Sequence, residues 1–68
     1  GKNMKKRTLL ASAATIEGIK KMCIMYFCTD TVFLSPITKN TWEVATGKGK
    51  KLEYRVIQKN HRFRFEVE

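Results

Sequence analysis

The hydrophobic pattern of the chain changes its period once, close to Asp30. Before that point, apolar residues recur with the spacing of one face of an α-helix. This stripe consists of Ile16, Ile19, Cys23, Tyr26 and Phe27. Thr15 is a suitable N-cap and Glu17 suits the positive end of the helix dipole, whereas Ser12 would cap a helix that begins earlier. The pattern therefore predicts one amphipathic helix that begins near residue 15 and ends near residue 27.

After Asp30, apolar and polar residues alternate with a period of two, which is typical of strands with one buried face. Short turn-forming segments separate these stretches, and Pro36 is expected to end the first of them. The predicted strands are 31–35, 41–46, 52–58 and 62–68, and GKGKK at 47–51 is expected to form a turn or short loop. Strand alternation directs one set of side chains to the buried face: Trp42, Val44, Leu52, Tyr54, Val56, Phe63, Phe65 and Val67.

One helix and four strands with short connections favour a two-layer α+β fold. We expect an N-terminal helix packed on a four-stranded antiparallel sheet, in the order α-β-β-β-β, with the strands forming a meander. Residues 1–11 are expected to form a basic, flexible N-terminal segment, and residues 12–68 a single small domain. A chain of 68 residues is too short to bury a large core.

The register of the last hairpin decides which charges face each other on the outer side of the sheet. A two-residue loop at Lys59 and Asn60 would set Arg55 opposite Arg64. A four-residue loop from Lys59 to Arg62 would set Arg55 opposite Glu66. Like charges directly opposite each other are destabilising, so we expect the four-residue loop. The Arg–Arg register would instead indicate a surface that needs an anionic partner.

The charge of the chain is the composition feature that bears most on function. Fourteen Lys and Arg residues oppose six Asp and Glu residues, for a formal net charge of +8. A small body with this charge attracts polyanions, and phosphate binding needs clustered cations rather than a strict motif. Eleven of these positive residues form an N-terminal group (Lys2, Lys5, Lys6, Arg7), a glycine-loop group (Lys48, Lys50, Lys51) and a last-hairpin group (Arg55, Lys59, Arg62, Arg64).

We therefore predict a non-enzymatic module that contacts the phosphates of DNA or RNA with little sequence specificity. The predicted contact residues are Lys48, Lys50, Lys51, Arg55, Lys59, Arg62 and Arg64. Phe63 and Phe65 alternate with the arginines, so they are expected to point into the core rather than to stack on bases. In size and charge the chain resembles small basic proteins of phages and mobile elements, a resemblance of composition that no motif carries.

The alternative is a protein-interaction module or a homodimer. Met22, Ile24 and Met25 widen the apolar surface of the helix beyond one narrow face. A thin core cannot bury all of them, and methionine is common on adaptable binding surfaces. These three residues are the predicted protein interface.

Several other chemistries lack the residues that they need. Cys23, Cys28 and the single histidine, His61, do not form a zinc motif, so neither metal nor cofactor is expected. His61 is expected to be a turn residue, and no nucleophile stands in a recognisable catalytic context. TGKGKK departs from the phosphate-loop pattern. The two cysteines are expected to be free in a reducing cytoplasm, and neither a membrane anchor nor a signal peptide is expected.

Overall fold

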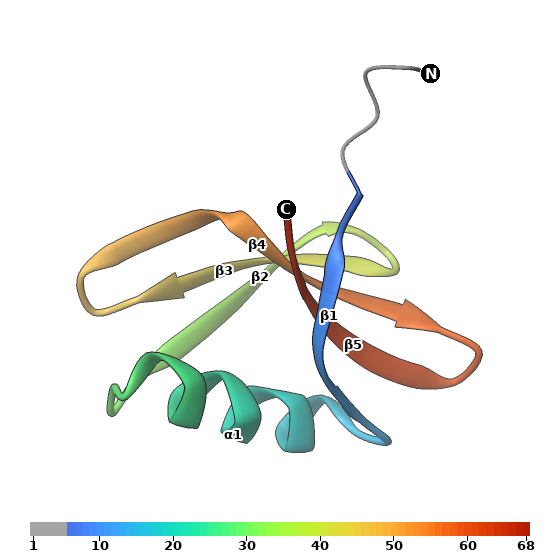
Figure 1. Cartoon of the computed structure of the whole chain (residues 1–68), viewed down its shortest axis with the longest axis horizontal. Coiled ribbons are helices and arrows are strands. Elements are labelled where there is room, and N and C mark those ends of the chain that lie inside the picture. Colours follow the sequence, from blue (N-terminus) through green and yellow to red (C-terminus); the bar gives the residue numbers. More distant parts are fainter. Residues whose placement is uncertain (1–5) are drawn as a thin grey trace.

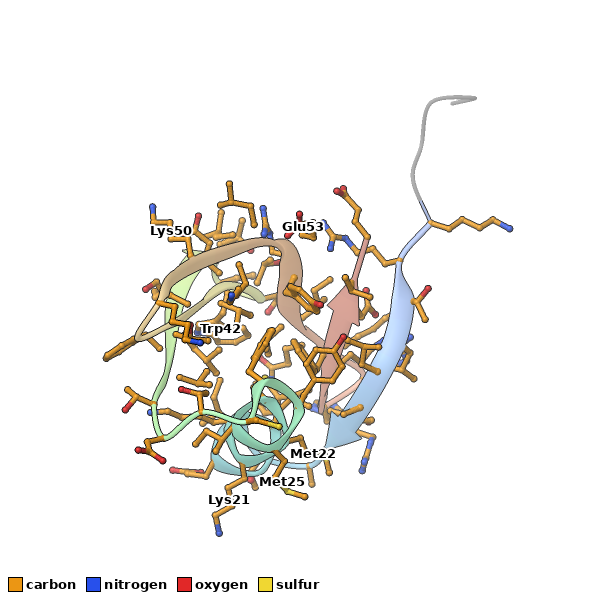
Figure 2. The ribbon with its side chains drawn as sticks, turned by 60° about the vertical axis from the view of Figure 1, so that its left-hand side comes forward. Lys21, Met22, Met25, Trp42, Lys50 and Glu53 are labelled. Carbon is orange, nitrogen blue, oxygen red and sulfur yellow. The ribbon has the colours of Figure 1, made fainter. Side chains whose placement is uncertain are left out.

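The computed structural model describes residues 6–68 and confirms an α+β fold with one helix and an antiparallel sheet. The elements are β1 (Thr8–Ala13), α1 (Ile16–Phe27), β2 (Val32–Thr38), β3 (Thr41–Thr46), β4 (Gly49–Lys59) and β5 (Arg62–Val67). The sheet has five strands in the order β1-β5-β4-β3-β2. The helix covers one face of this sheet (Figure 1). In Figure 2, which looks nearly along α1, β1 and β2 lie on its two sides.

The prediction of four strands after an N-terminal helix was wrong, because β1 precedes the helix and pairs with β5. Residues 8–11, expected to be flexible, belong to this strand, and residues 1–5 of the same segment lie outside the described part of the chain. The strand was missed because its sequence, TLLASA, does not alternate. A register shift between Leu9 and Ala11 breaks the period, and alanine and serine have little intrinsic strand preference.

The helix is capped as the sequence predicts. The Thr15 hydroxyl accepts a hydrogen bond from the backbone N–H of Gly18 at 3.0 Å. A β-carbon at Gly18 would lie 3.2 Å from the β-carbon of Ala13, so the glycine allows the helix to pack closely on the end of β1. At the other end, Cys28 adopts the left-handed conformation with φ of 53°, and its N–H bonds back to the last helical turn.

The core lies between the helix and the inner face of the sheet. Ile19 and Cys23 of the helix are fully buried there, as the helical stripe predicts. Each of the five strands contributes one buried apolar side chain: Ala13, Val32, Val44, Val56 and Phe65. Half-buried rings of Phe27, Tyr54 and Phe63 extend this cluster towards its edges.

Two of the predicted strand boundaries were wrong. Pro36 does not end the first predicted strand but lies inside β2, where an edge strand tolerates a residue that cannot donate a ladder hydrogen bond. The segment 47–51 is not wholly a loop either, because β4 begins at Gly49 and leaves a tight turn at Gly47 and Lys48.

β4 carries an irregularity that the alternating pattern did not predict. Between Glu43 and Ala45 of β3, the paired residues on β4 jump from Arg55 to Lys50. The extra residues turn Leu52 outward, and it is 62% exposed rather than buried as predicted. A bulge of this kind bends the strand and leaves carbonyl groups without ladder partners.

The pairing predicted for the last hairpin is confirmed, with Val56 opposite Phe65 and Arg55 opposite Glu66. The ladder continues further than expected, up to the pair of Lys59 and Arg62, so the turn itself contains only Asn60 and His61. Both have positive φ, at 54° and 65°. Two successive residues of this kind are the mark of a type I′ hairpin turn.

Candidate nucleic-acid interface

The seven predicted contact residues do not converge on one surface. Lys48, Lys50 and Lys51 lie at the β3–β4 turn, and Lys59, Arg62 and Arg64 lie at the β4–β5 turn. Figure 1 shows these two hairpin tips at opposite sides of the molecule, joined by the length of β4. They are therefore two separate groups of cations, and each has its own surroundings. The N-terminal cations Lys2 and Lys5 lie outside the described residues.

Two of the three lysines at the β3–β4 turn have structural partners. The ammonium of Lys50 lies 3.8 Å from the Glu43 carboxylate, and that of Lys51 lies 5.8 Å from the centre of the Phe27 ring. Lys48 and Lys51 line a hollow of about 140 Å³ beside Cys28 at the C-terminal end of α1. The last carbonyls of a helix carry partial negative charge, and no basic residue lies in the last turn of α1. Lys48 and Lys51 place positive charge near this end of the helix instead.

Arg55 is held by the backbone of its own strand. Its guanidinium donates from Nη1 to the carbonyl oxygens of Leu52 and Tyr54, at 2.9 and 2.8 Å. Both carbonyls belong to the irregular part of β4. Arg55 thus satisfies carbonyl acceptors in a segment of β4 that has no partner residues on β3, which is a structural role.

The remaining three cations gather around one hollow at the β4–β5 turn. This hollow of about 320 Å³ is lined by Ser12, Lys59, Asn60, Arg62 and Arg64. We call these five residues the hairpin patch. The Nε of Arg62 donates to the Ser12 hydroxyl at 3.0 Å, which fixes the guanidinium over the edge of the sheet. Ser12 was missed as a site residue because only the pairing of β1 with β5 brings it opposite Arg64.

The charges of the hairpin patch are unevenly compensated. Arg64 donates to the Glu66 carboxylate at 2.6 Å, and Glu66 is only 9% exposed. Lys59 lies directly opposite Arg62 on the ladder. Neither of these two residues joins any ion pair among residues 6–68. The patch therefore has one neutralised arginine and a like-charged pair beside it.

The predicted protein-interface residues differ in their exposure. Met25 is 75% exposed and Met22 is 39% exposed, and Figure 2 shows both on the side of α1 turned away from the sheet. Ile24 instead is half-buried and packs against the core. Sequence periodicity could not separate these three, because the exposure of a helix flank depends on how far the curved sheet reaches around it.

Two side chains near the helix have shifted pKa values. Tyr26 and Tyr54 share a hydrogen bond between their hydroxyl groups at 3.1 Å. This bond, together with burial, raises the pKa of Tyr54 to about 12. Burial alone raises the pKa of the Cys23 thiol to about 12, so Cys23 remains protonated and is a poor nucleophile at neutral pH.

His61 is a turn residue, as predicted. Within residues 6–68, no cluster of three or more His, Cys, Asp or Glu side chains could hold a metal ion. In that part of the chain, α1 is too short and too polar to cross a membrane. Comparison with protein-family models, with curated proteins and with solved structures finds no match to this chain. Function must therefore be inferred from the residues of the chain itself.

Proposed function

We propose that the protein is a small, non-enzymatic binding module that contacts nucleic-acid phosphates through the hairpin patch. The observation that carries this proposal is the direct pairing of Lys59 with Arg62 beside a hollow that Arg64 also lines. Like charges in this position destabilise a hairpin, by up to about 1 kcal/mol. A bound phosphate offsets that repulsion, since it accepts charge-assisted hydrogen bonds from both side chains.

The set of proposed phosphate-contact residues is smaller than the set predicted from the sequence. Lys50, Lys51 and Arg55 have protein partners, so they are less available to a ligand than Lys59 and Arg62. The net charge of +8 adds a long-range attraction that does not depend on sequence. Binding through phosphates alone predicts low sequence specificity. The two free thiols suit a reducing, cytoplasmic setting for this activity.

The test is a salt titration of nucleic-acid binding with matched charge variants. The double variant K59Q/R62Q should bind a labelled duplex of about 20 base pairs about tenfold more weakly at about 50 mM salt. Its plot of log K against log salt should be shallower by about 2, because two phosphate contacts are lost. The control is K20Q/K21Q, which removes the same charge from exposed positions on α1.

The control variant should retain affinity to within about threefold, since it tests net charge rather than position. Equal losses of affinity in the two double variants would show that binding depends on the net charge of the protein and not on the hairpin patch. If the unmodified protein binds neither DNA nor RNA at low salt, the proposed function is wrong.

A second candidate function is self-association through the exposed helix face, and the exposure of Met22 and Met25 favours it. Apolar side chains of this size gain free energy when a partner removes them from water. The protein should then sediment as a dimer, and M25K should convert it to a monomer without unfolding it. A monomeric mass at about 100 μM, a concentration at which even weak dimers form, would contradict this candidate.

A further inference from the structure

The tip of the β4–β5 hairpin combines two features that are unfavourable for the isolated protein. Asn60 and His61 occupy left-handed backbone positions, which glycine adopts without strain. Asparagine and histidine adopt this conformation more often than most residues, but both do so at a cost that glycine does not have. The pair of Lys59 and Arg62 adds electrostatic repulsion directly behind the turn. Strain and like charge at one place are typical of a surface shaped for a ligand.

This tip extends beyond its neighbouring strands. The last residue of β1, Ala13, pairs with Phe63. On the other side, the N–H of Gln58 donates to the carbonyl of Asn40 at 2.8 Å. The pair of Lys59 and Arg62 and the turn that follows lie beyond both contacts, and Figure 1 shows this end of the hairpin at the outer edge of the sheet. The protein therefore presents a narrow two-stranded ribbon with polar side chains at its end.

Beside the hairpin patch, no Phe, Tyr or Trp ring of residues 6–68 on the outer face of the sheet is available for unpaired bases to stack on, and the exposed His61 ring lies in the turn. Phe63 and Phe65 point towards the core. The outward positions nearest the patch carry Ser12 on β1, Ile57 on β4 and Glu66 on β5. Proteins that hold single-stranded nucleic acid depend on aromatic stacking in addition to charge. A base-paired ligand suits this surface better.

We propose, on the basis of the proposed function, that the ligand is double-stranded B-form DNA and that the hairpin tip enters its major groove. Strands in a ribbon lie about 4.8 Å apart, and the major groove, about 12 Å wide, admits a two-stranded ribbon. Lys59 and Arg62 contact phosphates at the groove wall. Asn60 and His61 lie against base edges, where an asparagine amide can pair with adenine. The major groove of an RNA duplex is too narrow for such a ribbon.

The test compares three ligands of one sequence: a DNA duplex, an RNA duplex and single-stranded DNA. The variant H61G is central, because it removes the side chain at the tip while relieving backbone strain. Its melting temperature should be equal to or above that of the unmodified protein. Its affinity for the DNA duplex should fall about fivefold, and its affinity for single-stranded DNA should change by less than about twofold. N60G is expected to behave in the same way.

The outcomes separate this inference from the proposed function. Tighter binding to single-stranded DNA or to the RNA duplex would overturn the groove assignment and leave phosphate binding in place. If H61G and N60G keep the duplex affinity of the unmodified protein while K59Q/R62Q loses affinity, the groove assignment is also overturned and phosphate binding remains. Protection of guanine N7 from methylation in the duplex would support major-groove entry, and its absence at saturating protein would contradict it. Absence of binding to all three ligands would overturn both proposals.

Discussion

Phe65→Ala is expected to remove a large part of the free energy of unfolding of the protein. Phe65 is fully buried, and its ring lies between 5.3 and 5.8 Å, centre to centre, from those of Tyr26, Phe27 and Tyr54. Truncating such a side chain costs about 3–5 kcal/mol through lost burial and the cavity left behind. A domain of this length has a total stability of only about 3–10 kcal/mol. Urea denaturation followed by circular dichroism would measure the loss.

The matched control is Phe33→Ala, which removes the same atoms from an edge strand. Phe33 is 53% exposed on β2, so its truncation leaves no closed cavity. We expect a loss below about 1 kcal/mol. Similar losses for the two phenylalanines would show that Phe65 does not lie at the centre of the core.

Glu66→Gln is expected to lower stability and to strengthen nucleic-acid binding in the same protein. The substitution keeps the shape of the side chain but removes the charge that pairs with Arg64 at 2.6 Å. Because Glu66 is nearly buried, the loss should be about 1–2 kcal/mol. Arg64 then becomes available to phosphate, which should raise duplex affinity several-fold and steepen the salt dependence by about 1. Denaturation and salt-dependent binding measure the two effects separately.

Glu43→Gln is the control for this prediction. It removes the same charge from a more exposed ion pair, with Lys50 at 3.8 Å, at the other end of β4. Exposed pairs contribute little, so stability should change by less than about 0.5 kcal/mol. Affinity should rise less than in E66Q, because the freed lysine lies far from the hairpin patch. If E66Q loses stability without gaining affinity, Arg64 does not contact the ligand.

The fold was predictable where a single element could be recognised from its own residues. The helix cap at Thr15 and the buried positions Ile19 and Cys23 follow from local spacing. The register of the last hairpin follows from the preference of Arg55 for a place opposite Glu66. β1 was not predictable in this way, since its pairing with β5 supplies the strand geometry that its own composition does not favour.

The candidate site was predictable in its residue types but not in its grouping. Lys51 and Arg55 resemble Lys59 and Arg62 in the sequence, and only tertiary contacts separate them. Arg55 is held by carbonyls that a strand bulge exposes, and the alternating pattern gives no sign of that bulge. Ser12 joins the hairpin patch from a strand that composition did not indicate.

The candidate site forms only when β1 pairs with β5, and this pairing has the largest loop-closure entropy in the sheet. Thr8 pairs with Val67, so the contact joins residues from nearly opposite ends of the described chain, and loop-closure entropy opposes it more than any hairpin contact. Ser12 and Arg62 meet only when this closure is complete. An anion bound at the hairpin patch therefore favours the closed sheet by mass action, and occupancy of the site and integrity of the whole fold are thermodynamically linked.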